Sequence, residues 1–261
     1  MFHVHSSRLM QPCSRQVILM AKSPGPQAKT RLQTRLSEQA RGRLVAAMLR
    51  DTLQTLLSLA PELPGLSVRL ACAPHPETPE LQTLRTWLAP HDTTTTLRLY
   101  WSEQRGVSLG ERLRTALHEA LAQGAGQVLF IGSDSPTLPA STLLQAFFAL
   151  ETHEIVLGPA FDGGYYLLGL HADLPAALDH IPWSTPEVLA HTCQQARQAG
   201  HSLALLPFWY DVDEPTDLDF LMRHLQALRA AGDQTSGQET EALLKALAAE
   251  SPPRSLYPTG A

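Results

Sequence analysis

The residues best suited to chemistry in this chain are carboxylates and cations in short polar loops that directly follow apolar runs. Asp134 lies in the segment Gly-Ser-Asp-Ser-Pro (residues 132–136), immediately after the apolar run of residues 128–131. Mg²⁺ prefers oxygen ligands, so a carboxylate at this point could hold a divalent cation against phosphate oxygens. The alternative interpretation is that Asp134 only shapes the turn before the next helix.

Three cations, Lys22, Lys29 and Arg31, lie in the Pro- and Gly-containing loop that follows the first predicted buried strand, residues 16–21. Backbone N–H groups in a loop between a strand and a helix attract anions, and lysine and arginine side chains add donors suited to phosphates. The loop is not a Walker loop, because the second glycine before the lysine is missing. The alternative is a solvated basic turn. We assign nucleotide and phosphate binding to Lys22, Gly25, Lys29, Arg31 and Ser133.

Two more carboxylates, Asp211 and Asp213, follow the last predicted strand. If they met Asp134 over one Mg²⁺ or Mn²⁺ ion, the metal would help to neutralise a diphosphate and support its departure. Either aspartate could instead be the N-cap of the helix that follows. The spacing alone leaves both interpretations open.

The segment Asp-Gly-Gly-Tyr-Tyr (residues 162–166) has the composition of a ligand-binding loop. Its two glycines allow the backbone to approach a ligand closely. Asp162 could act as a catalytic base or bind acceptor hydroxyls, and Tyr165 could stack on a nucleobase or sugar. A tight loop with core tyrosines is the alternative. We assign acceptor binding to Gly163, Gly164, Tyr165 and Trp183.

Strands and helices alternate along the chain, which predicts βαβ units and a mostly parallel sheet. Strands are expected near residues 16–21, 66–73, 95–101, 128–131, 154–157 and 202–206, and another follows the loop that begins at residue 158. Helices are expected near 37–59, 80–88, 106–123, 141–150, 217–230 and 239–250, and one begins at Ser184 or Thr185 and runs to residue 199. In such sheets ligands bind beyond the carboxyl ends of the strands, where Asp134 is placed.

Composition favours a single folded domain with an intracellular role. The 261 residues are 44% hydrophobic and 17% charged, with a net charge of −5, which gives no sign of nucleic-acid binding. The three cysteines form no readable framework, no apolar run is long enough to span a membrane, and the amino terminus lacks a signal-peptide core. We expect a cytoplasmic protein with a flexible extension (1–15), a catalytic domain (16–230) and a tail with a possible helix (231–261), its oligomeric state open.

Taken in order, these segments resemble a known bacterial family. The resemblance rests on these motifs: Lys-x-Pro-Gly from residue 22, Lys-Thr-Arg-Leu (29–32), Gly-Glu-Arg (110–112), Ile-Gly-Ser-Asp-Ser-Pro (131–136), the Asp-Gly-Gly-Tyr-Tyr loop, Trp-Ser-Thr (183–185) and Asp-Val-Asp-x-Pro-x-Asp-Leu (211–218). Together they are similar to the GT-A-like transferases labelled selenodomain-associated transferase or arsenosugar-biosynthesis glycosyltransferase, over residues 16–228.

The resemblance implies a GT-A or nucleotide-diphospho-sugar transferase fold, a Rossmann-like three-layer α/β sandwich with a mostly parallel mixed sheet. It also implies that Asp134 and Asp213 are metal ligands, although the usual Asp-x-Asp is absent because Pro136 stands where its second aspartate would be. The expected activity is glycosyl transfer from a nucleotide-sugar to a small-molecule acceptor. The basic loop also resembles that of the phospholactate guanylyltransferases, which keeps nucleotidyl transfer from a nucleoside triphosphate as the alternative. A non-catalytic nucleotide-binding protein is the third hypothesis.

Overall fold

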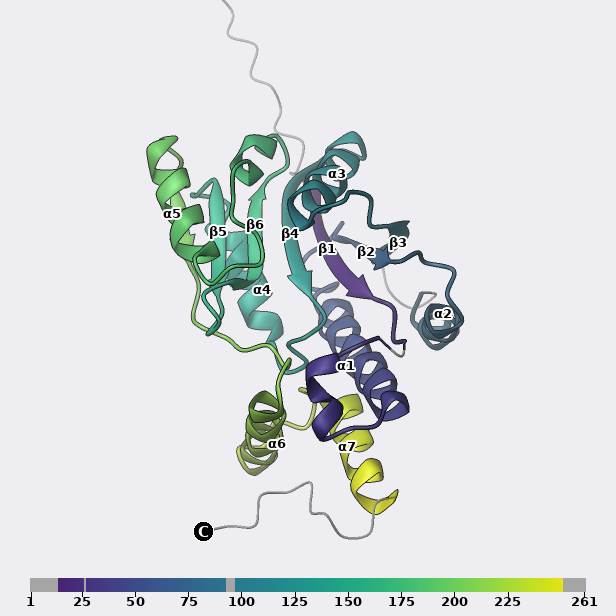
Figure 1. Cartoon of the computed structure of the whole chain (residues 1–261). Helices are drawn as coiled ribbons and strands as arrows, with labels where there is room; N and C mark the ends of the chain where they lie inside the picture. The colour runs from purple at the N-terminus through teal and green to yellow at the C-terminus, as the bar shows by residue number, and fades with distance from the viewer. Residues whose placement is uncertain (1–13, 26, 93–96, 251–261) are drawn as a thin grey trace, which may run out of the picture.

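The computed structural model describes residues 14–25, 27–92 and 97–250 of the 261-residue chain. It is a three-layer α/β sandwich built on a seven-stranded sheet of order β3-β2-β1-β4-β6-β5-β7 (Figure 1). The strands are β1 (Ser14–Lys22), β2 (Ser67–Ala73), β3 (Arg98–Glu103), β4 (Ala125–Gly132), β5 (Ile155–Pro159), β6 (Tyr165–His171) and β7 (Leu203–Leu205). The helices are α1 (Glu38–Ser58), α2 (Pro79–Asp92), α3 (Leu109–Ala122), α4 (Ala140–Ala149), α5 (Val188–Gln198), α6 (Pro215–Ala230) and α7 (Gln238–Glu250), with short 3₁₀ helices η1 (Thr30–Thr34) and η2 (Pro175–Leu178).

The sheet is parallel except at β6, which runs antiparallel to both of its neighbours, β4 and β5. The expected mostly parallel mixed sheet is therefore confirmed. The apolar run predicted to form a central strand lies in β4 between β1 and β6, and its four residues are at most 4% exposed. An uninterrupted apolar run suits this position because both faces of the strand are covered.

Two hydrophobic cores cover the two faces of the sheet. One core contains apolar side chains of α1, α2 and α4, and the other contains those of α3, η2 and α5. A third core lies on the far side of α1, where η1, α6 and α7 pack through residues such as Leu44, Leu221 and Leu244. The loop that follows β1 is thus held between the sheet and this third core.

Several predicted boundaries are wrong by a few residues. Strand β1 begins at Ser14, inside the segment assigned to the amino-terminal extension, and β3 begins at Arg98. Helix α5 begins at Val188 and not at Ser184 or Thr185, because Ser184 has a left-handed backbone with φ 65° and the Thr185 hydroxyl donates to the Pro182 carbonyl. Residues 1–13, expected from the sequence to be flexible, and residues 251–261, the end of the tail, lie outside the described residues.

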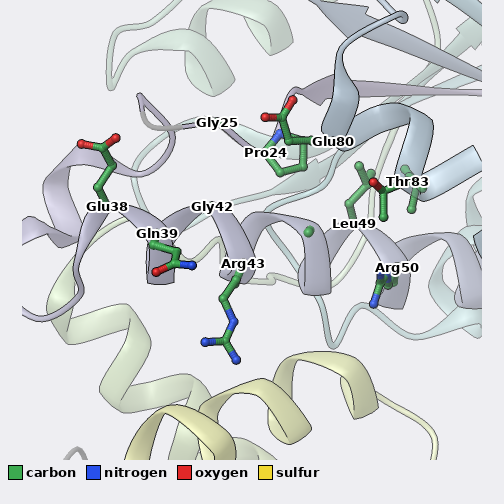
Figure 2. Close-up of a pocket in the computed structure, with 12 residues that line it drawn as sticks. Pro24, Gly25, Glu38, Gln39, Gly42, Arg43, Leu49, Arg50, Glu80 and Thr83 are labelled. Atoms are coloured by element: carbon green, nitrogen blue, oxygen red, sulfur yellow. The ribbon is translucent and has the colours of Figure 1, made fainter. Parts of the chain in front are cut away.

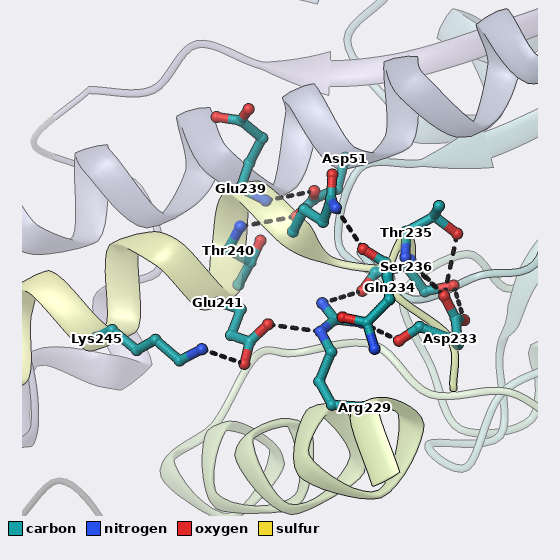
Figure 3. A network of polar contacts seen from close by, with 11 residues as sticks. Asp51, Arg229, Asp233, Gln234, Thr235, Ser236, Glu239, Thr240, Glu241 and Lys245 are labelled. Atoms are coloured by element: carbon teal, nitrogen blue, oxygen red, sulfur yellow. Dashed lines mark hydrogen bonds and ion pairs between the residues drawn. The ribbon is translucent and has the colours of Figure 1, made fainter. Parts of the chain in front are cut away.

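Helix α7, expected only as a possible helix of the tail, is docked on α1 through a buried cap (Figure 3). The Asp51 side chain in α1 is 2% exposed and accepts hydrogen bonds from the backbone N–H groups of Glu239 and Thr240, at 2.8 and 2.9 Å. Arg229 of α6 donates to Glu241 at 2.8 Å and thereby joins α6 to α7. A carboxylate from one helix thus satisfies the free amide groups at the start of another.

We expect the contribution of Asp51 to stability to fall as the pH rises. Burial raises the pKa of its carboxyl to about 6, although the two backbone hydrogen bonds act in the opposite direction. Because the folded state binds a proton more tightly than the unfolded chain, unfolding free energy decreases as pH rises from the unfolded value near 4 towards 6. Melting curves recorded between pH 4.5 and 7.5 should show a larger loss of stability in the wild type than in Asp51→Asn, which keeps only the loss due to other groups such as Asp211.

The matched control is Glu62→Gln, which removes an exposed carboxylate on the loop after α1. Its melting temperature should follow that of the wild type at each pH. A wild type and an Asp51→Asn protein with parallel pH profiles would contradict the predicted titration of Asp51.

Candidate active site

The predicted site residues gather at one edge of the sheet because of the direction of its strands. Strands β1 and β4 are parallel, so the loops that follow both of them leave at the same edge, where η1 and the start of α6 also lie (Figure 1). Strand β6 is antiparallel to β4, so its amino-terminal end and the preceding loop with Asp162 lie at that edge as well. This is the carboxyl end of the parallel strands, where α/β folds bind ligands.

Lys29 is the centre of the site. Its Nζ atom lies 2.8 Å from Oδ1 of Asp134 and 2.7 Å from Oδ1 of Asp213, and its side chain is only 6% exposed. Its backbone is left-handed, with φ 48°, at the start of η1. Burial on its own lowers the pKa of Lys29, but the two carboxylates outweigh it and raise the pKa above its ordinary value. The amine is therefore a permanent positive charge between two carboxylates.

Backbone and side-chain contacts fix the distance between the two aspartate loops. The Val212 N–H donates to the Asp134 carbonyl at 2.9 Å, and the Ser135 hydroxyl donates to the Asp211 carboxylate. A buried hydrogen bond of 2.8 Å joins the hydroxyls of Thr137 and Tyr210. These links hold the loop after β4 against the loop before α6, so Asp134 and Asp213 stay next to each other.

Neither Asp211 nor Asp213 caps α6, so that alternative is wrong. The N-cap is Glu214, and Asp217 completes a capping box by accepting the N–H groups of Asp213 and Glu214, at 3.0 and 2.8 Å. The two aspartates differ in their surroundings. Burial raises the pKa of Asp211 to about 6 and its carboxylate faces Ser135, whereas the side chains of Asp134 and Asp213 are 37% and 46% exposed. Asp134 and Asp213 are thus the pair open to a ligand.

The donor set fits a divalent cation. Two carboxylate oxygens converge on one positive centre, at present the Lys29 ammonium, and Mg²⁺ is commonly bound by one or two carboxylates together with substrate phosphates. The described residues do not form a complete metal site by themselves, because no group of three or more His, Cys, Asp or Glu side chains among them is arranged to hold a metal ion. Any metal here would need substrate oxygens to complete its coordination.

A cavity of about 680 Å³ opens above these carboxylates, a volume within the range of small-molecule sites. It brings together most of the residues that the sequence predicted, namely Lys22, Lys29, Arg31, Ser133, Asp134, Asp162, Gly164, Tyr165, Trp183, Asp211 and Asp213. Arg31 is 71% exposed at its rim and lies 3.7 Å from the Glu214 carboxylate.

Two predicted residues, Gly25 and Gly163, do not line this cavity. Gly25 lies beside a separate cavity of about 450 Å³ between α1 and α2 (Figure 2). Gly163 has φ 86°, and a Cβ atom there would meet the Pro186 carbonyl oxygen at 2.1 Å. Its carbonyl accepts the Leu189 N–H at 3.0 Å. Gly163 therefore lets the Asp162 loop close against the segment before α5.

The sequence interpretation missed several lining residues, including Met20, Gln27, Leu109, Ser184 and Thr185. It also gave no role to Gly110, where a Cβ atom would lie 2.4 Å from the Trp183 indole nitrogen. The Gly-Glu-Arg segment that contains Gly110 carried part of the family resemblance, and this close packing is a physical reason for a glycine there. Trp183 rests on α3 through this contact and meets Tyr165 edge to face, with ring centroids 6.1 Å apart.

The chain belongs to the family described as "Uncharacterized protein conserved in bacteria (DUF2064)", whose model matches residues 55–185. It is 30% identical over 201 residues to a phosphoenolpyruvate guanylyltransferase from Sphaerobacter thermophilus, a match that covers 76% of this chain and 87% of the relative. It is 31% identical over 208 residues to a 3-phospho-D-glycerate guanylyltransferase from Phenylobacterium zucineum, covering 76% and 86% of the two chains.

The fold has a counterpart among solved structures. A crystal structure from Desulfovibrio desulfuricans, provisionally described as a nucleotide-diphospho-sugar transferase, matches with a TM-score of 0.73 and 30% identity, covering 90% of this chain and 95% of the other. A 4-diphosphocytidyl-2C-methyl-D-erythritol synthase from Anaerococcus prevotii matches with a TM-score of 0.52 and 13% identity, over 82% and 96% of the chains, and shows the fold alone. The chain is an enzyme of the transferase class. None of the helices in the described ranges is long and apolar enough to cross a membrane.

Proposed function

We propose that this enzyme transfers a nucleotidyl group from a nucleoside triphosphate to a small acceptor and releases pyrophosphate. The observation that carries the phosphorylated donor is the buried Lys29, held between Asp134 and Asp213 beside a cavity that Lys22 and Arg31 also line, and the names of the two curated relatives favour nucleotidyl over glycosyl transfer. Several cations that line one cavity suit a ligand with several phosphates. The two curated relatives named guanylyltransferases support the same reaction.

In this proposal the loop after β1 binds the phosphates of the donor. Lys29 supplies a charge that is already in place, since its carboxylate partners hold it in one position before substrate arrives. Lys22 and Arg31, nearer the rim, add charge along the β- and γ-phosphates, and the Ser133 hydroxyl supplies a hydrogen bond. Because Lys29 is already held in position, it does not have to reorganise as negative charge develops on the leaving pyrophosphate.

Asp134 and Asp213, the two exposed carboxylates beside Lys29, would be the residues that hold Mg²⁺ or Mn²⁺. When bound, the metal would act as a Lewis acid on phosphate oxygens. Asp211 would keep the Asp134 loop in place through Ser135 rather than contact the metal.

The acceptor would lie between the phosphates and the wall formed by Asp162, Gly164, Tyr165 and Trp183. An acceptor oxygen attacks the α-phosphorus, the bond from that phosphorus to the bridging oxygen breaks, and pyrophosphate leaves with the bonding electrons. In this proposal Asp162 takes the proton of an attacking hydroxyl; the role is supported by the Gly164 N–H, which holds its Oδ1 at 2.9 Å, and by Oδ2, for which no described residue provides a hydrogen bond.

Glycosyl transfer from a nucleotide-sugar is the second candidate, supported by the Desulfovibrio desulfuricans structure. This reaction breaks the bond between the sugar carbon and the diphosphate oxygen, so a nucleoside diphosphate leaves in place of pyrophosphate. The same cations and carboxylates would serve both reactions, and the identity of the leaving group separates them.

The test is to incubate the purified enzyme with Mg²⁺ or Mn²⁺, each of the four nucleoside triphosphates or a panel of nucleotide-sugars, and a mixed panel of acceptors. The acceptors include phosphorylated acids and neutral sugars. Pyrophosphate release matched by an equal amount of nucleotidylated acceptor is the expected result. Release of a nucleoside diphosphate from a nucleotide-sugar, with no pyrophosphate from any triphosphate, would replace nucleotidyl transfer by glycosyl transfer.

A further inference from the structure

The charges that line the active-site cavity are divided unevenly between its two walls. Among the described lining residues, every lysine and arginine comes from the end of β1 and the loop that follows it. The opposite wall, formed by the Asp162 loop and residues 183–188, contains no lysine, arginine or histidine. Asp162 is the charged side chain that lines the cavity on this wall; the exposed Glu187 belongs to the same segment but is not among the lining residues. The wall that we assign to the acceptor is therefore neutral or acidic.

Two of the three cations of the first wall, Lys29 and Arg31, already have carboxylate partners, and the exposed third one, Lys22, forms no ion pair with any described residue. Lys29 is neutralised by Asp134 and Asp213, and Arg31 lies 3.7 Å from Glu214. A donor triphosphate would bring further negative charge to this side of the cavity. An acceptor that carried its own phosphate and carboxylate would then face the donor phosphates on one side and Asp162 on the other, and among the described lining residues its own wall supplies no cation.

The acceptor wall offers flat apolar surface and groups that hydrogen-bond to hydroxyls. Tyr165 and Trp183 pack edge to face, and both also line a smaller apolar cavity of about 150 Å³ that adjoins the first and includes Leu109 and Leu113. Ser184, Thr185 and the Asp162 carboxylate lie on the same wall. Aromatic faces next to a carboxylate and hydroxyls match the C–H faces and hydroxyl edges of a sugar or polyol.

We propose that the acceptor is an uncharged molecule of the sugar or polyol kind, which reacts through one of its hydroxyls, and not a phosphorylated acid. This inference takes its donor, a nucleoside triphosphate, from the proposed function. It adds the chemical class of the acceptor. The hydroxyl oxygen bonds to the α-phosphorus, its proton passes to Asp162, and pyrophosphate departs. The product is a phosphodiester. This acceptor class differs from those in the names of the two curated relatives.

The first experiment measures binding, which does not depend on which bond the enzyme breaks. The full-length protein, with Mg²⁺ and a non-hydrolysable triphosphate, is titrated with glucose, N-acetylglucosamine, glycerol, phosphoenolpyruvate and 3-phospho-D-glycerate. Binding is measured as a change in tryptophan fluorescence. The part of this change that the wild type shows and Trp183→Phe lacks is assigned to Trp183. We expect saturable quenching by at least one neutral compound and weaker binding of both phosphorylated acids. Tighter binding of a phosphorylated acid, or no binding of any neutral compound, would overturn the inference.

The second experiment uses Asp162→Asn, which removes the charge of the acceptor wall and keeps its shape. Binding of the neutral ligand should weaken by about tenfold, because a hydrogen bond to a charged group is lost. Binding of the phosphorylated acids should stay the same or improve, because the repulsion is gone. Asp173→Asn, at the opposite end of β6, is the matched control and should change neither class. A loss of phosphorylated-acid binding in Asp162→Asn would contradict the inference.

The two proposals fail in different ways. If neutral compounds bind but no triphosphate yields pyrophosphate, the acceptor class stands and nucleotidyl transfer fails. If pyrophosphate release is stimulated by a phosphorylated acid and by no neutral compound, nucleotidyl transfer stands and the acceptor class is wrong.

Discussion

Replacing Lys29 by methionine should lower turnover by about 10²- to 10³-fold, the range typical for loss of one fixed charge-stabilising donor. Methionine keeps the length and the buried apolar part of the side chain, so the change removes the ammonium and little else. Lys29 is 6% exposed and touches two carboxylates, which means that no neighbouring cation can take its position without moving the loop. Turnover is measured as pyrophosphate release at saturating nucleotide.

The same variant should bind Mn²⁺ more tightly than the wild type when no nucleotide is present. Without the ammonium, Asp134 and Asp213 repel each other at short range, and a divalent cation relieves that repulsion. Calorimetric titration with Mn²⁺ checks this and does not depend on turnover. Lys245→Met is the matched control, since Lys245 pairs with Glu241 on α7, away from the site. A Lys29→Met enzyme with wild-type turnover would show that Lys29 has no part in the reaction.

The sequence predicted the sheet well because its strands carry local signals. The run of residues 128–131 is apolar without alternation, and such a run is stable only in a strand that is covered on both faces. Strand β1 ends at Lys22 and β4 at Gly132, and the parallel order of these two strands then brings their loops to one edge. Asp134, Lys22 and Arg31 could be placed there from these signals alone.

Contacts between distant parts of the chain could not be predicted in this way. Lys29 and Asp213 are 184 positions apart, and nothing local to either residue indicates that they form an ion pair. The same holds for Asp51, whose carboxylate caps a helix 188 positions later and so joins α7 to the folded core. Helix α5 starts late because Ser184 adopts a left-handed backbone, which tertiary packing imposes against the capping preference of a Ser-Thr-Pro segment.

The charged residues of the site do not distinguish nucleotidyl transfer from glycosyl transfer. Both reactions stabilise a phosphate-bearing leaving group, so Lys22, Lys29, Arg31 and the two exposed aspartates are equally suited to each. The cation-rich wall therefore indicates a phosphorylated donor without specifying which bond breaks. The uneven charge of the two walls appears only in the fold, because residues 162–188 and residues 22–31 meet across the cavity.

Replacing Asp134 by asparagine should abolish metal-dependent turnover, with a loss of about 10²-fold or more, while the protein stays folded. Asparagine is nearly isosteric, its side-chain oxygen can still accept a hydrogen bond from Lys29, and the backbone link from Val212 to the Asp134 carbonyl does not involve the side chain. What disappears is the negative charge that attracts a divalent cation. Steady-state rates across a Mg²⁺ titration, together with a melting curve, separate the two effects.

Two comparisons decide how that result is interpreted. Asp173→Asn, at the opposite edge of the sheet, should keep wild-type rates and wild-type dependence on Mg²⁺. Asp213→Asn should reproduce the loss seen with Asp134→Asn, because both carboxylates face the same Lys29 Nζ at nearly equal distances of 2.7 and 2.8 Å. The double variant should then be little worse than either single one, since residues that act together on one cation are not additive. An Asp134→Asn enzyme that remains active and still depends on metal would place the cation elsewhere and leave the pair only a structural role around Lys29.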